Sequence, residues 1–143
     1  MEVDEDKLVS FFHRHLVPLC AIFTVENKAA VYVATAFILS AENEWFLVTA
    51  GHVALDIKSY LQNPKYSLNK ALLYDYGGLS AVHREPIPFE LIPDNLLVFG
   101  DEITLDYGVI HLRPHYKDLL IANGIEPLNE EVWYHQPQEP QFF

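Results

Sequence analysis

The stretch Phe46–Ile57, FLVTAGHVALDI, decides the fold prediction. It opens on an apolar run of the kind that a buried β-strand carries, and the run stops at Thr-Ala-Gly. A histidine, His52, follows at once. We expect the strand to end at this point, which would hold His52 on the rigid rim of a sheet.

Five further segments have the character of short strands, because they are rich in β-branched and aromatic residues and are bounded by polar residues, glycine or proline. The six predicted strands are Leu19–Glu26, Val31–Ser40, Trp45–Ala50, Leu68–Tyr76, Ile87–Ile92 and Leu105–Leu112. Their number and spacing predict an all-β barrel or sandwich. Pro88 lies inside the fifth segment, so that strand is expected at an edge or at a bulge.

Helical patterns flank the strands. Asp4–Leu16 has apolar residues at spacings of three and four, with acidic residues at its start and basic ones near its end. This pattern predicts a short amphipathic helix that Pro18 ends. His115–Gly124 is the second predicted helix, with Gly124 as its stop signal.

The composition excludes several classes of function. The chain has 143 residues, which fits one domain, and a net charge of -11, which argues against nucleic acid or an anionic membrane as partner. Its one cysteine, Cys20, excludes an intrachain disulfide and a multi-cysteine zinc site. The acidic N-terminus is unlike a signal peptide, and no apolar stretch has the length of a membrane helix, so we expect a cytoplasmic protein by default.

Two short elements each place a residue of catalytic type at the end of an apolar strand. They are Thr49-Ala50-Gly51-His52 and Asp106-Tyr107-Gly108-Val109-Ile110. Together they resemble the T-A-[AG]-H and D-[IYFL]-[AG]-[LVI]-[ILV] elements of the trypsin-like (chymotrypsin-fold) serine peptidases, and their separation is of the right order for that family. One departure is Ala34-Thr35-Ala36-Phe37, where the family has G-[ST]-G-F.

The resemblance implies a fold and a mechanism. The fold would be a six-stranded antiparallel chymotrypsin-like barrel over residues 17–114, the first of the family's two, after a helical segment at residues 1–16. The reaction would be hydrolysis of a peptide bond in a polypeptide substrate by acyl transfer. His52 would be the general base and Asp106 the residue that orients it, with Thr49, Ala50 and Gly51 as supporting positions.

The family's nucleophile is not in this sequence. It is the serine of a G-[DN]-S-G-G element in the second barrel, and the residues after Asp106 include no serine, threonine or cysteine. Residues 115–143 would then be a connector towards a missing second barrel, and the chain alone is predicted to be inactive. The alternative is a catalytically dead barrel that acts as a binding or interaction module. Either form would expose the apolar face meant for the second barrel, which offers a surface for association.

A zinc site is the remaining candidate. His111 and His115 have the i, i+4 spacing of two ligands on a helix, but Pro114 breaks the helical register between them. No acidic third ligand is evident nearby. We therefore expect no metal and no cofactor, and interpret the two histidines as surface or turn residues.

Overall fold

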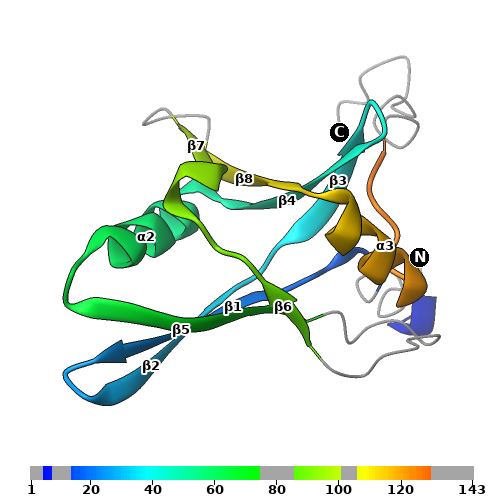
Figure 1. The fold of residues 1–143 in the computed structure, drawn as a ribbon. Helices are drawn as coiled ribbons and strands as arrows, with labels where there is room; N and C mark the ends of the chain where they lie inside the picture. Colours follow the sequence, from blue (N-terminus) through cyan, green and yellow to red (C-terminus); the bar gives the residue numbers. More distant parts are fainter. Residues whose placement is uncertain (1–4, 8–13, 75–85, 101–105, 130–143) are drawn as a thin grey trace.

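The computed structural model describes residues 5–7, 14–74, 86–100 and 106–129, and this part of the chain is predominantly β. Eight strands form two antiparallel sheets of four strands each (Figure 1). The first sheet has the order β2 (Lys28–Ala34), β1 (Leu19–Val25), β5 (Tyr66–Leu73) and β6 (Ile87–Phe89). The second has the order β3 (Phe37–Ala41), β4 (Glu44–Ala50), β8 (Asp106–Leu112) and β7 (Leu96–Gly100).

Two α-helices lie at opposite ends of the pair of sheets (Figure 1). Helix α2 (Gly51–Gln62) contacts β8, β7, β5 and β4, and α3 (Pro114–Ala122) contacts β8. A single 3-10 turn, η1 (Pro93–Asn95), leads into β7. None of the helices in the described ranges has the length and apolar character needed to cross a bilayer.

The core lies between the two sheets and follows the alternation of their strands. Inward residues of β4 and β8 face each other in register, as Trp45 does with Leu112 and Leu47 with Ile110. The first sheet contributes Leu19, Ala21 and Phe23 in the same alternating way. Residues after β8 join this core, since Leu120 of α3 and Ile125 are both buried in it.

Two hairpins share one turn chemistry. The β1–β2 turn has Glu26 and Asn27 at φ 51° and 64°, and the β3–β4 turn has Glu42 and Asn43 at φ 51° and 66°. Positive φ at both central residues is the pattern of a type I′ turn, which matches the twist of the strands it joins. The strand ranges predicted from the sequence leave Asn27–Ala30 and Ala41–Glu44 for these two turns, and the first of these segments begins slightly too late.

The prediction of six strands was wrong in its count. The segment Val31–Ser40 divides into β2 and β3 at Thr35 and Ala36, because the chain leaves one sheet for the other there. The Ala36 carbonyl instead accepts a hydrogen bond from the Val17 amide at 2.8 Å. Strand β7 was not predicted at all. The described strands form two open sheets and not a single closed ladder of six.

The prediction for residues after the Thr-Ala-Gly stop was also incomplete. The chain does leave β4 at Ala50, as predicted, but it enters α2 directly, and His52 is the second residue of that helix. The predicted helix Asp4–Leu16 lies largely outside the described residues, of which 5–7 and 14–15 are helical. The predicted helix at His115–Gly124 corresponds to α3.

The contrast between a buried leucine of β4 and an exposed leucine of β7 gives a test of the core. Leu47 is 2% exposed and Leu97 is 52% exposed. We expect Leu47→Ala to lower the free energy of unfolding by about 2–5 kcal/mol, because it removes buried methyl groups and leaves a cavity. The matched variant Leu97→Ala should change it by less than about 0.5 kcal/mol. Urea denaturation measures both, and equal losses would contradict this placement of the two side chains.

Candidate active site

Strand register brings the two sequence elements together. Strands β4 and β8 pair antiparallel, with Thr49 opposite Gly108 and Ala50 opposite Tyr107. Extending that register by one residue places Gly51 beside Asp106, where the β4 chain turns into α2. His52 therefore enters the helix next to the first residue of β8.

One carboxylate contacts His52 twice. Nδ1 of the His52 ring lies 2.7 Å from Oδ2 of Asp106, and the His52 backbone N–H donates to Oδ1 of the same carboxylate at 2.8 Å. The ring distance is within hydrogen-bond reach, as a general base and its orienting acid require. The second contact fixes the carboxylate against rotation, because both of its oxygens are engaged.

The backbone contact also completes the N-terminus of α2. The N-cap residue is Ala50, whose side chain cannot cap, and the first turn of the helix has no acidic residue. Free N–H groups at a helix start favour a negative charge and a hydrogen-bond acceptor. Asp106 supplies both from a neighbouring strand, so it acts as a capping group for α2 as well as a partner for the ring.

The pair has a defined protonation pattern. The hydrogen bond from the His52 side chain is the main cause that lowers the pKa of Asp106 below its ordinary value of 3.8. The carboxylate is therefore charged near neutral pH and can accept a hydrogen bond from Nδ1–H, and in that tautomer Nε2 is the ring nitrogen with the free lone pair. The side chains of His52 and Asp106 are 72% and 56% exposed, so Nε2 is open to a reactant.

Two glycines allow the close approach of α2 to β8. A Cβ atom on Gly51 would lie 2.5 Å from Oδ1 of Asp106 and 2.8 Å from the Tyr107 backbone nitrogen, which is too close for either atom. A Cβ atom on Gly108 would collide with Cβ of Ala54 in the helix. Glycine is therefore the residue that this packing requires at both positions.

The other supporting positions act through the backbone. The Thr49 hydroxyl donates to the Thr35 carbonyl at 2.8 Å, which ties the end of β4 to the connection between β2 and β3. Ala50 is extended, with φ -66° and ψ 143°, and forms the corner between strand and helix. Of the predicted site residues, His52, Asp106 and Gly51 are thus in direct contact or adjacent, and Thr49 and Ala50 hold the turn beneath them.

The histidines considered for zinc do not converge. His111 pairs with Glu44, its Nε2 lying 2.7 Å from Oε2, whereas His115 is in α3 with its ring against Tyr116. Within the described ranges, no three histidine, cysteine or acidic side chains come together in a way that could hold a metal ion.

Helix α2 and the packing of Gly108 against it were not predicted from the sequence. The signal for the helix was present, because Ala54, Ile57 and Leu61 have helical spacing and Asn63-Pro64 is a stop. Ala54 and Ile57 are buried in the structure, while Leu61 packs partly buried against the core. We interpreted the apolar stretch only as the end of a strand, so the packing of Gly108 on Ala54 could not be foreseen.

Comparison of the chain with protein-family models, with curated proteins and with solved structures finds no match in any of the three.

The lowered pKa of Asp106 predicts how the pair responds to acid. A carboxyl whose pKa is lower in the folded state stabilises that state above the unfolded-state pKa, and the contribution is lost as the pH falls through the folded-state value. We expect the Asp106 carboxyl carbon to titrate below 3.8 in an NMR titration, and His52→Ala to raise that midpoint towards 3.8. An identical midpoint in both proteins would show that the ring contact is not formed in solution.

The close approach at Gly51 predicts a specific sensitivity. Gly51→Ala places a methyl group where Asp106 and the Tyr107 backbone now lie, so β8 must move away from α2. We expect a loss of about 1–3 kcal/mol in the free energy of unfolding, as for other overpacked sites. The downfield NMR signal of the proton between His52 and Asp106 should be lost as well. Retention of that signal at unchanged stability would contradict the geometry.

Proposed function

We propose that this chain is the N-terminal half of a trypsin-like serine endopeptidase, with His52 as base and Asp106 as orienting acid. The observation that carries the proposal is the two-point contact of Asp106 with the ring and the backbone N–H of His52, at 2.7 and 2.8 Å. An ordinary surface ion pair uses one contact and leaves the ring free to rotate. Here the tautomer and the ring orientation are both constrained, which a general base needs.

The strand order supports the barrel that this family has. If β2 and β3 are taken as one bent strand across Thr35 and Ala36, and β6 and β7 as one across η1, six strands remain. Each of them then has a hydrogen-bonded neighbour on both sides, and the order returns to its starting point. A ring of this kind is the connectivity of a barrel, with the two open sheets as its two halves.

In the proposed reaction, the serine comes from a part of the enzyme that this sequence does not include. His52 Nε2 accepts the proton of the serine hydroxyl as its oxygen bonds to the substrate carbonyl carbon. The protonated ring then donates that proton to the amine that leaves when the peptide bond breaks. Asp106 stays charged throughout and stabilises the protonated ring.

An exposed aromatic pair at the end of β7 and β8 is consistent with a second barrel as its cover. Phe99 of β7 and Tyr107 of β8 are 43% and 37% exposed, although both are aromatic. The rings of Phe99 and Tyr107 stack at 5.1 Å in register, one residue from Asp106. A second unit that packed here would bury these two rings.

A binding module without cleavage is the second candidate, and the exposure of the pair favours it. The orienting aspartate of a working triad is buried, whereas the Asp106 side chain is 56% exposed. As a capping group for α2, Asp106 has a structural reason to be present in either case. The two candidates differ in whether a nucleophile ever reaches Nε2.

The first experiment uses the chain as given. We expect no turnover of peptide substrates and no labelling by a fluorophosphonate probe, because no serine of this sequence stands in the glycine-rich context of the family's nucleophile. Labelling of this chain would contradict the proposal. The coding sequence downstream of Phe143 then separates the candidates, since the enzyme requires an in-frame G-x-S-G-G element on the order of a hundred residues later.

Variants of a longer protein that contains the G-x-S-G-G element would test the roles of His52 and Asp106. We expect His52→Ala to lower kcat by about 10⁶-fold and Asp106→Asn by about 10⁴-fold. The matched control is His111→Ala, since His111 belongs to a second histidine–carboxylate pair of the same 2.7 Å length. Equal effects of His52→Ala and His111→Ala would remove the base assignment and favour the binding module.

A further inference from the structure

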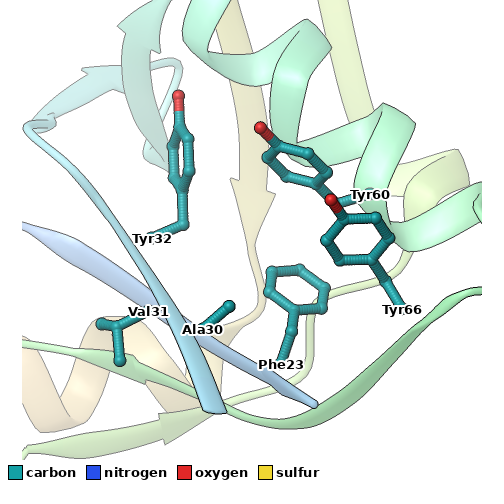
Figure 2. Close-up of a pocket in the computed structure, with 6 residues that line it drawn as sticks. All are labelled: Phe23, Ala30, Val31, Tyr32, Tyr60 and Tyr66. Atoms are coloured by element: carbon teal, nitrogen blue, oxygen red, sulfur yellow. The ribbon is translucent and has the colours of Figure 1, made fainter. Parts of the chain in front are cut away.

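A second feature of the fold is a small pocket with aromatic walls, away from the His52–Asp106 pair. It has a volume of about 170 Å³ and is lined by Phe23, Ala30, Val31, Tyr32, Tyr60 and Tyr66 (Figure 2). Tyr60 lies on α2 eight residues beyond His52, which places it about 12 Å further along the helix. The pocket is thus separate from the His52–Asp106 pair and independent of the proposed peptidase function.

Four rings from four elements form a concave corner. Phe23 of β1 is buried at the base of the pocket, and the half-buried rings of Tyr32 (β2), Tyr60 (α2) and Tyr66 (β5) surround it. Tyr60 is central, with ring centroids 5.7 Å from Tyr32, 4.9 Å from Tyr66 and 6.0 Å from Phe23. Their planes are inclined by 61°, 35° and 66°, so the rings present differently directed faces and do not form one flat stack.

The electrostatic character of the pocket favours a cation. None of the six lining residues is charged, and aromatic faces carry partial negative charge. The Tyr32 hydroxyl donates to Oδ2 of Asp56 at 3.4 Å, which places a carboxylate at the rim. Burial, followed by the charge of Asp56, raises the pKa of Tyr32, so the hydroxyl stays protonated and keeps this contact.

A second pocket provides a contrast. It has a volume of about 260 Å³, and its lining includes Asp94, His111 and Arg113. Because acidic and basic side chains occur together there, that pocket has no clear preference for ligand charge. The aromatic pocket has an acid at its rim and no base in its lining, in a chain of net charge -11.

We propose that the corner formed by Phe23, Tyr32, Tyr60 and Tyr66 is a binding site for a quaternary methylammonium group. Such a group is weakly hydrated and has no N–H donors that would need buried acceptors, so aromatic faces suffice to hold it. A cavity of about 150 Å³ can accommodate benzene, and a trimethylammonium head is of similar size. The group occurs in choline compounds and in trimethylated lysine, and the pocket recognises the chemistry that both share.

The decisive experiment compares choline with 3,3-dimethylbutan-1-ol, which has the same shape but no charge. Binding is followed by NMR, through the upfield ring-current shift of the ligand methyl protons and the shifts of the Ala30 methyl group. We expect choline to bind at least about fivefold more tightly than the neutral alcohol. Equal affinity of the two ligands, or binding of neither, would overturn the proposal.

Variants identify the groups responsible. Tyr60→Leu keeps the pocket apolar but removes its central ring, so we expect choline affinity to fall about tenfold and the preference over the alcohol to vanish. Asp56→Asn should weaken choline alone, by up to about fivefold. Its matched control is Asp118→Asn, an exposed helical aspartate on α3, which should leave both affinities unchanged. Equal losses in the two asparagine variants would mean that the overall charge, and not this site, attracts the ligand.

Tyr60 also packs against the core, so the exposed Asp56→Asn variant keeps the test decisive if Tyr60→Leu does not fold. The source of the ligand is distinguished by titrating phosphocholine and N-acetyl-trimethyllysine amide in parallel. We expect at least one of them to bind, and unmethylated N-acetyl-lysine amide to bind more weakly than its trimethylated form. Stronger binding of the unmethylated lysine would contradict recognition by aromatic faces.

Discussion

The two-point contact of the Asp106 carboxylate with His52 is the interaction on which the described site depends. Oδ1 accepts a hydrogen bond from the backbone N–H of His52 at the start of α2, and Oδ2 lies within hydrogen-bond distance of Nδ1 of the ring. Capping alone explains the first contact, because α2 begins after an alanine and has no acid in its first turn. It does not explain the second, since a capping carboxylate needs no histidine. The ring contact is therefore the part of this geometry that points to chemistry.

The contact between Asp106 and His52 requires β4 and β8 to pair in one register and α2 to lie close to β8. β4 and β8 pair as far as Ala50 and Tyr107, and a slip of one residue would carry Asp106 away from the helix and turn its side chain to the other face. Gly51 and Gly108 remove the two methyl groups that would hold α2 off the sheet. Each of the two sequence elements thus contains a candidate site residue, His52 or Asp106, and a glycine. The glycine allows the close packing that positions the candidate residue.

The difference between local sequence patterns and tertiary contacts explains what could be predicted from the sequence. The apolar run that stops at Thr-Ala-Gly predicted β4, and richness in β-branched and aromatic residues placed β1, β5 and β8 to within a few residues. The bend at Thr35 and Ala36 could not be predicted, because it depends on a hydrogen bond from Val17, distant in sequence. The contact between Asp106 and the N-terminus of α2 is equally a tertiary feature. The pairing of His52 with Asp106 came from the resemblance to a family, and local pattern alone would not have supplied it.

Two histidine–carboxylate pairs within the described residues have the same 2.7 Å separation, so the distance alone does not distinguish them. His111 and Glu44 are diagonal neighbours across β8 and β4, as strand pairing commonly produces, and a single oxygen contact joins them. Glutamate reaches that contact through a longer side chain with one more rotatable bond. Asp106 has the shorter side chain and uses both oxygens, one of them on a backbone that the helix fixes. Orientation distinguishes the two pairs, and orientation is what a general base requires.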